Sequence, residues 1–490
     1  MSMNNANEIM EGLVKSKNIY NLLANLYFLC SKEFITIYNF LQEDSNRRKF
    51  HSYLQNFKKE LEPLSQDIFT TDFQKVIKIL KRVKGASGKD CLIIAWSFLR
   101  AIDLTISNDR AFLKKMEAIW CDVSEPFGIK RYRFLFKPKN LILNMIKNKL
   151  PDHKLKSGIH IGQRIEDRLQ NIIMYEELPG RKIRFGTIDK EVNELLNEQG
   201  KNLAFAVAPI SCNYDYSFKR FDSSEGVPYV FDEIKNRQEI KALIDALLRR
   251  CIREDVHIVV FPELTIDGPL REYLSGWLRD NNTARKIIMV IAGSYHMLEN
   301  EGKEKYVNSS MIYRFDGREL WKQEKMHQFQ LDEEDISELR TSTGSGLQNF
   351  KNLFNVTDLK GWEHIQISDT LVLYDSPVGR MAVAICLDFI VRENMKLLLE
   401  PHANIIFVPA MSASLKKMEI ANKHLGTFGA ASIFCANSCW LLTGGEKKNL
   451  NFDHTSYIYL PYKGRLRRLK CHSDCNCLQC TLEIIRISEI

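Results

Sequence analysis

Apolar residues in the first third of the chain recur at intervals of three and four positions. This spacing places them on one face of an α-helix and predicts helices that pack through that face. We expect helices over residues 20–41, 49–61, 72–83, 91–106, 110–120 and 141–150. Residues 1–178 are therefore predicted to form a mostly α-helical domain, in which we find no catalytic combination of residue types.

The rest of the chain has a different pattern, in which short continuous apolar runs alternate with helical segments. The runs predict buried strands over residues 203–209, 256–261, 286–292 and 309–315, and residues 239–253 predict a helix after the first of them. Such alternation is typical of an α/β sheet. We therefore expect a second, α/β domain over residues 200–490, joined to the first by the stretch 178–200.

Three reactive side chains in this second domain are placed next to apolar strand-like runs. Glu263 follows residues 256–262, Cys386 follows residues 381–385, and Lys325 lies in the run 321–327. Each has an ordinary alternative explanation: a strand-end carboxylate, a cysteine packed in the core, and a solvated lysine. Their order, similar separation and shared position at strand ends favour a single site.

A carboxylate, an ammonium and a thiol together suit nucleophilic attack on carbon. A free thiol has a pKa of about 8.5, so a base must accept its proton as the sulfur attacks. Glu263 is predicted to be that base, because burial raises the pKa of a carboxylate. Lys325 and the backbone N–H of Leu387 are predicted to stabilise the negative charge that develops on oxygen or nitrogen.

The order Glu263, Lys325 and Cys386 resembles the Glu-Lys-Cys triad of the nitrilase superfamily, the carbon–nitrogen hydrolases. Asn308 and the turn at residues 374–380 are similar to family features at the corresponding places. The resemblance implies a nitrilase-like four-layer α-β-β-α sandwich over residues 200–490, preceded by the helical domain.

The resemblance also implies a second glutamate that orients the lysine and the substrate. Glu363 is the candidate, Glu338 is a competitor, and a loop carboxylate at the surface is the alternative. The chain departs from the family at residues 428–437, which lack its charged residues, and at residues 411–414, which lack a nearby tryptophan. The segment between Lys325 and residue 369 is a long polar lid. These departures bear on substrate choice and subunit contacts more than on the triad.

The resemblance implies a thiol hydrolase that cleaves non-peptide C–N bonds through a thioester on Cys386, without a cofactor for catalysis. Small amides are favoured over nitriles because most nitrilase-like branches act on amides. Acyl transfer to an amine uses the same residues and stays open. A glutaminase role beside an NAD synthetase is disfavoured, because we find no nucleotide-binding loop in the sequence.

Composition agrees with a globular protein of two domains. Of the chain's residues, 45% are hydrophobic and 27% are charged, which is ordinary for a globular protein. A length of 490 residues is too great for a single domain of this fold. The sequence shows no amino-terminal positive segment followed by an apolar one, so no signal peptide is expected. Charged residues at positions 32 and 33 interrupt the most apolar early stretch, 22–41, so no membrane span is expected either. Twelve cysteines without a secretion signal favour the cytoplasm.

Two short segments of the first domain are locally basic. Residues 81–85 and 130–137 carry lysines and arginines, and the second interleaves them with aromatic residues. Such a pattern can contact nucleic acid. A solvated helix face or an interdomain contact is favoured, because a net charge of +8 is modest for this length.

Four cysteines lie close together near the carboxyl end. Cys471, Cys475, Cys477 and Cys480 can supply the four thiolates of a tetrahedral structural zinc site. Their spacing matches no standard zinc finger, so free or redox-sensitive thiols are the alternative. The cluster lies between two predicted closing strands, 456–460 and 481–487.

A second class of function is an effector or assembly protein. Nitrilase-like subunits form homodimers that can extend into larger arrays, and the helical domain is a candidate for binding a partner protein. Similar domains occur fused to reverse transcriptases in bacterial antiviral systems, but this chain has no Tyr-x-Asp-Asp polymerase motif and would need a separate partner. A structural pseudoenzyme is the remaining alternative.

Overall fold

The computed structural model describes most of the chain. The described residues are 11–64, 73–82, 88–105, 120–123, 130–138, 140–142, 144, 169–176, 178–210, 214–300, 305–341, 348–412, 415–428, 431–438, 440, 456–461, 466–469 and 482–489. The chain divides into two compact units, Met1–Lys137 with His160–Pro179, and Pro138–Ile159 with Gly180–Ile490. Residues 180–200, which we expected only to connect two domains, form strand β4 (Lys182–Thr187) and helix α11 (Lys190–Gln199) of the second unit.

Helices make up most of the described part of the first unit. They are α2 (Ile19–Lys32), α3 (Phe34–Phe40), α4 (Asp44–Leu61), α5 (Phe73–Lys81) and α6 (Gly88–Thr105). The predicted helix over residues 20–41 is interrupted at Glu33, and the apolar faces of all five helices share one core. No helix among the described residues combines the length and the apolar character needed to cross a membrane.

The first unit also contains a sheet that the sequence pattern did not predict. Strands β1 (Trp120–Val123), β2 (Lys130–Phe136) and β3 (Ile172–Glu176) pair antiparallel in that order. The basic segment 130–137, which we interpreted as a solvated helix face or an interdomain contact, is therefore mostly the central strand of this sheet. Its cationic and aromatic residues alternate with the two-residue period of a β-strand. Most of the predicted helices over 110–120 and 141–150 lies outside the described residues.

Asp103 of α6 connects the helices of the first unit to this sheet. Its buried carboxylate accepts the backbone N–H groups of Gln170, Asn171 and Ile172, at 2.7, 2.9 and 3.0 Å, and pairs with Arg100 at 2.8 Å. These bonds hold the start of β3 against the end of α6.

Replacing Asp103 with alanine is expected to destabilise the first unit by about 3 kcal/mol, because buried backbone N–H groups would lose a charged acceptor. Urea unfolding of the full-length protein measures this loss. Asp90→Ala is the matched control, since Asp90 forms an exposed pair with Lys49 at 3.0 Å and such pairs contribute at most about 1 kcal/mol. Equal losses for the two variants would contradict the assignment.

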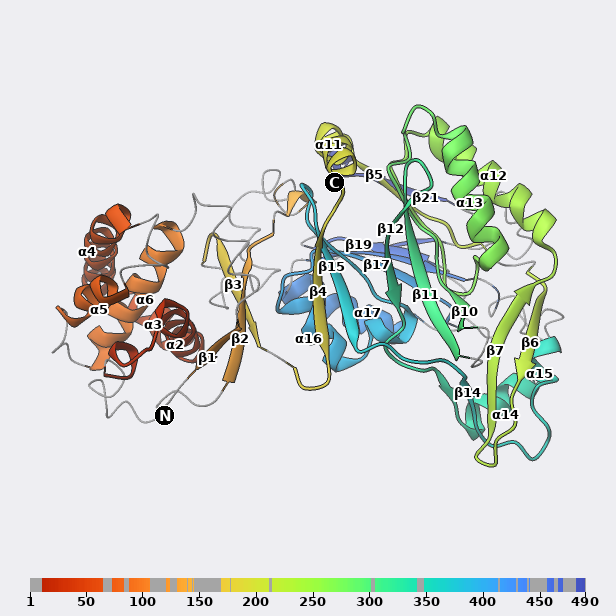
Figure 1. Ribbon diagram of the computed structural model, residues 1–490, viewed down its shortest axis with the longest axis horizontal. Coiled ribbons are helices and arrows are strands. Elements are labelled where there is room, and N and C mark those ends of the chain that lie inside the picture. Colours follow the sequence, from red (N-terminus) through yellow and green to blue (C-terminus); the bar gives the residue numbers. More distant parts are fainter. Residues whose placement is uncertain are drawn as a thin grey trace. The chain divides into compact units, whose positions relative to one another are not determined.

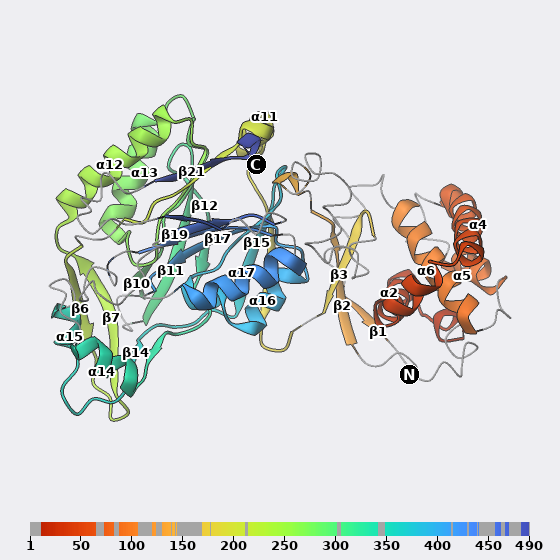
Figure 2. The same cartoon turned by 180° about the vertical axis from the view of Figure 1, so that it is seen from behind.

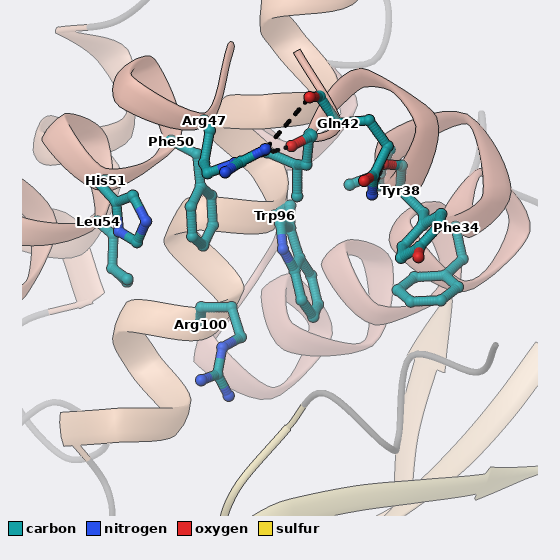
Figure 3. Close-up of a pocket in the computed structure, with 11 residues that line it drawn as sticks. Phe34, Tyr38, Gln42, Arg47, Phe50, His51, Leu54, Trp96 and Arg100 are labelled. Atoms are coloured by element: carbon teal, nitrogen blue, oxygen red, sulfur yellow. Dashed lines mark hydrogen bonds between the residues drawn. The ribbon is translucent and has the colours of Figure 1, made fainter. Parts of the chain in front are cut away.

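Helices α3, α4 and α6 enclose an apolar pocket of about 380 Å³ (Figure 3). Phe34, Phe50 and Trp96 line it, and Arg47 lies at its edge. The Arg47 guanidinium donates to the backbone carbonyls of residues 41 and 42, at 3.3 and 3.2 Å. It therefore satisfies carbonyl groups that the end of α3 leaves without helical partners.

Two seven-stranded sheets form the centre of the second unit. The first has the order β10-β11-β9-β8-β5-β21, with β12 paired to β11. Its strands are β5 (Ala204–Val207), β8 (Ile258–Val260), β9 (Met289–Ile291), β10 (Tyr295–Asn300), β11 (Lys305–Arg314), β12 (Glu319–Glu324) and β21 (Glu483–Arg486). The four buried strands predicted in this domain are thus confirmed as β5, β8, β9 and β11.

The second sheet has the order β20-β19-β18-β17-β16-β15-β4. Besides β4, its strands are β15 (Thr370–Asp375), β16 (Arg380–Val383), β17 (Ile405–Ala410), β18 (Ser432–Asn437), β19 (Ser456–Tyr459) and β20 (Leu466–Leu469). Strands β15 and β16 are the hairpin predicted around residues 374–380.

The two sheets pack face to face between helices. The ring of Phe205 on β5 stacks on that of Phe434 on β18, with centroids 4.2 Å apart. Helices α12 (Arg237–Arg253) and α13 (Gly268–Asn281) cover the first sheet, and α16 (Arg392–Leu399) and α17 (Lys416–Phe428) cover the second (Figures 1 and 2). The predicted four-layer α-β-β-α sandwich is therefore confirmed.

A four-stranded sheet in this unit was not predicted. It has the order β13-β14-β7-β6, with β6 (Tyr216–Arg220), β7 (Val227–Ile234), β13 (Gln330–Leu331) and β14 (Gly361–Glu363). The segment after Lys325, predicted as a polar lid, supplies β13 and β14 together with α14 (Glu333–Thr341) and α15 (Gln348–Lys351). This sheet matters for the site because β14 ends at Glu363.

Candidate active site

Strand ends bring the predicted site residues together. Lys325 directly follows β12, Glu363 ends β14, and Cys386 comes shortly after β16. Glu263 comes shortly after β8 and bridges to the loop after β9 at Ser294. The preceding Gly293, at φ +60, lets that loop approach so closely that a Cβ there would lie 1.9 Å from a backbone oxygen of the Glu263 segment.

Lys325 lies at the centre of the group. Its Nζ donates to Glu263 Oε1 at 2.8 Å and to Glu363 Oε2 at 2.7 Å, and the residue is only 1% exposed. Burial by itself lowers the pKa of Lys325, but the two carboxylates raise it, and the net shift is well upward. The side chain is therefore an ammonium ion, and the alternative of a solvated surface lysine is wrong.

Glu263 accepts three further contacts at the site. Its Oε1 accepts the side-chain amide of Asn308 at 3.1 Å, and its Oε2 accepts the backbone N–H of Met411 at 3.1 Å. Burial raises the pKa of Glu263, against the opposing effect of Lys325, and the charge of Glu363 raises it further. The carboxylate also interacts with the thiol of Cys386. The protonated form of Glu263 is thus favoured by burial and by the charge of Glu363, and disfavoured by Lys325.

Glu363 is buried in β14, so the alternative of a loop carboxylate at the surface is wrong. Besides Lys325, it accepts the backbone N–H of Phe329 at 2.9 Å, and its Oε1 lies 3.0 Å from His296 Nε2. Burial by itself would raise the pKa of Glu363, but Lys325 and His296 lower it to about 2. Its competitor Glu338 lies exposed on α14. The site therefore holds one permanently ionised carboxylate and one that can be protonated.

Cys386 begins a short 3₁₀ turn, η5 (Cys386–Phe389). Its φ of 48° is in the left-handed region, a strained backbone conformation that is common at functional sites. The residue is 8% exposed, and its Sγ lies 3.9 Å from the Met411 carbonyl. Burial and then the charge of Glu263 raise the pKa of the Cys386 thiol well above its usual value, although Lys325 lowers it. The thiol is therefore protonated.

Leu387 follows Cys386 at the start of this turn and is partly exposed. The first N–H groups of a helical turn have no partners within it, so they can face a bound group. This is the position at which we expected a backbone donor.

Asp388 links the Cys386 turn to the Lys325 segment. Its Oδ2 accepts the backbone N–H of Met326 at 2.9 Å, and its Oδ1 lies 3.1 Å from His327 Nδ1. The other ring nitrogen of His327 lies 2.8 Å from Nη2 of Arg181. Burial raises the pKa of Asp388, and its contact with His327 lowers it. Asp388 thus positions residues on both sides of the site.

Sequence reasoning missed three contributors to this site. His296 is a single histidine in β10, Asp388 lies two positions after Cys386, and Met411 contributes backbone atoms alone. For His296, the only sequence signal we find is its position close after the Gly-Ser pair at 293–294. For Met411 there is no sequence signal, because a backbone N–H does not depend on the residue type.

The predicted zinc site cannot be placed in this structure. Cys471, Cys475, Cys477 and Cys480 lie outside the described residues. Within the described ranges, no three His, Cys, Asp or Glu side chains form a group that could hold a metal ion.

One family model matches part of this chain. The family model described as carbon-nitrogen hydrolase matches residues 223–461. No curated protein matches the chain.

Several solved structures are similar at low identity. Nit3 of Saccharomyces cerevisiae, from branch 10 of the nitrilase superfamily, is 14% identical over 58% of this chain and 88% of its own, with a TM-score of 0.36. An amidase mutant from Nesterenkonia sp. AN1, carrying an acetamide moiety on its active-site cysteine, is 14% identical over 57% of this chain and 87% of its own, with a TM-score of 0.35. The glutamine-dependent NAD⁺ synthetase of Acinetobacter baumannii is 16% identical over 58% of this chain and 45% of its own, with a TM-score of 0.36.

Proposed function

We propose that residues 223–461, which match the carbon-nitrogen hydrolase family model, form a hydrolase domain, and that the chain hydrolyses small amides through a thioester on Cys386. The observation that carries the proposal is that the backbone of Met411 contacts both Glu263 and Cys386, at 3.1 and 3.9 Å. A buried protonated thiol and a carboxylate of raised pKa thus share one small space beside a fixed ammonium ion.

In the first half of the proposed cycle, Glu263 takes the thiol proton while Cys386 Sγ forms a bond to the amide carbon. The carbonyl oxygen becomes an anion, which Lys325 and the Leu387 N–H stabilise. Donors that are already in place cost no reorganisation at this step, and losing one typically lowers the rate by about 10²- to 10³-fold. Glu263 then gives its proton to the amide nitrogen, the C–N bond breaks, and the amine leaves.

In the second half, water attacks the thioester carbon and Glu263 takes a proton from it. The tetrahedral intermediate collapses, the C–S bond breaks, and the sulfur recovers the proton as the acid leaves. The proposed cycle uses no cofactor. An amine in place of water gives acyl transfer by the same steps, and a nitrile in place of the amide gives a thioimidate first.

Incubating the protein with a panel of small amides and nitriles tests this proposal. We expect intact-protein mass to show a substrate-dependent adduct, and peptide mapping to place it on Cys386. An adduct that maps to another of the cysteines, or turnover without dependence on Cys386, would overturn the proposed mechanism.

Replacing Glu263 with glutamine is expected to lower turnover by about 10²- to 10⁴-fold, the usual contribution of a general base. The amide keeps the size of the side chain but cannot take the thiol proton. Steady-state kinetics on the first substrate of the panel measures the loss. Glu338→Gln is the matched control: Glu338 is exposed on α14, so its variant should turn over as the wild type does. A fully active Glu263→Gln protein would rule Glu263 out as the base.

A further inference from the structure

The hydrogen bonds of His296 determine which ring nitrogen carries a proton. His296 lies in β10 and is 4% exposed. Its Nδ1 lies 2.9 Å from the backbone N–H of Phe231, which can only donate, so Nδ1 is the acceptor. In the neutral ring the proton is then on Nε2, which lies 3.0 Å from Glu363 Oε1. His296 therefore donates a hydrogen bond to Glu363.

The other partners of the two buried carboxylates, Glu263 and Glu363, are closely matched. Lys325 donates to them at 2.8 and 2.7 Å, and the Asn308 amide lies 3.1 and 3.4 Å from them. Each also accepts one backbone N–H, at 3.1 Å from Met411 and at 2.9 Å from Phe329. These contacts do not give the two carboxylates different chemistry.

One partner of each carboxylate differs. Glu363 has the ring N–H of His296, and Glu263 has the thiol of Cys386. A donated hydrogen bond favours the ionised form of a carboxylate. Two carboxylates become an acid–base group and a permanent anion when their surroundings separate their proton affinities, and His296 is the side chain that separates these two.

We propose that His296 is a positioning residue that keeps Glu363 ionised and oriented on Lys325, so that Glu263 alone exchanges a proton with Cys386. This inference rests on the proposed function and adds to it the reason why one of two similar glutamates is the base. Tyr229 of β7 also faces the group, but burial and then the charge of Glu363 raise its pKa well above its usual value, so it stays neutral.

Two substitutions of His296 separate its structural bond from its positioning bond. Asparagine reaches about as far as Nδ1 and can accept the Phe231 N–H, but it has no donor at the position of Nε2. Glutamine reaches about as far as Nε2 and can donate to Glu363. A purely structural role therefore predicts that His296→Asn is the milder change, and a positioning role predicts that His296→Gln is.

The rate at which iodoacetamide alkylates Cys386, followed by peptide mapping across pH, is the readout and needs no known substrate. We expect a single ionisation on the acid side for wild type and His296→Gln. For His296→Asn we expect a steeper limb, because Glu363 then titrates in the same range as Glu263, and about a tenfold lower rate at neutral pH, the factor for roughly one hydrogen bond to a charged group. In a protein that already carries Glu363→Gln, adding His296→Asn should not change the alkylation rate or its pH profile further.

The outcomes distinguish this inference from the proposed function. Absence of Glu263-dependent alkylation in the wild type would remove the proposed function itself. Normal alkylation with a wild-type pH profile in His296→Asn, or a His296→Gln protein as slow as His296→Asn, would overturn the role of His296 alone. If His296→Asn does not fold, an unaltered His296→Gln profile supports the inference and a steepened one contradicts it.

Discussion

Replacing Cys386 with alanine is expected to lower turnover by on the order of 10⁶-fold, the size of effect seen when the nucleophile of a covalent mechanism is removed. The other thiols among the described residues, those of Cys30, Cys91, Cys251 and Cys435, are all buried, so we do not expect them to replace it. The variant should also give no adduct with any compound of the panel. Stability should change by less than about 1 kcal/mol, because alanine retains most of the packing and the strained φ of 48° is common to both residues.

Cys435→Ala is the matched control for this variant. Cys435 lies fully buried in β18, and burial raises the pKa of its thiol to about 12. We expect this variant to form the adduct as the wild type does and to lose some stability from the smaller side chain. Intact mass, turnover and urea unfolding together measure both variants. Residual adduct in Cys386→Ala would show that the nucleophile lies elsewhere.

Replacing Lys325 with methionine is expected to destabilise the second unit by about 3–5 kcal/mol at neutral pH, because two buried carboxylates would lose their shared cation. Without it, the pKa of Glu263 and of Glu363 rises in the folded protein above the unfolded value. The folded state then binds more protons than the unfolded state, so stability falls as pH rises. The loss should therefore be larger at pH 8 than at pH 5.

Lys322→Met is the matched control, because Lys322 lies in β12, the strand that Lys325 directly follows, and forms a surface pair with Glu324 at 2.7 Å. That pair contributes at most about 1 kcal/mol. Urea unfolding of both variants at the two pH values measures the difference. A Lys325→Met protein as stable as Lys322→Met, or one without pH dependence, would mean that the buried carboxylates do not need the ammonium ion. Of these two variants, only Lys325→Met should have a lower turnover.

The parts of the fold that sequence reasoning found are those with a strong local pattern. β5 and β8 are continuous apolar runs buried on both faces, and α12 has a regular apolar stripe. The parts it missed depend on distant partners. β14 has only three residues and pairs with β7, and β4 buries a single side chain and pairs with β15. No local periodicity predicts such strands.

The same distinction holds at the site. Glu263, Lys325 and Cys386 could be selected from the sequence because each is a reactive side chain at a predicted strand end. Glu363 was a candidate only because the family resemblance implies a second glutamate. The structure places the four side chains together. The bond between His296 and Glu363 spans 67 positions and has no sequence pattern. Backbone donors such as Met411 N–H depend on the conformation of the chain and carry no residue signature.

Arg181 connects the start of the segment Gly180–Ile490 of the second unit to the candidate active site. It lies just after Pro179, where the first unit ends, and its guanidinium contacts the ring of His327, which in turn contacts Asp388. Asp388 sits in the same turn as Cys386 and holds the backbone beside Lys325. A chain of side-chain contacts thus links the first residues of the segment Gly180–Ile490 to the turn that holds the thiol and to the backbone next to the ammonium ion.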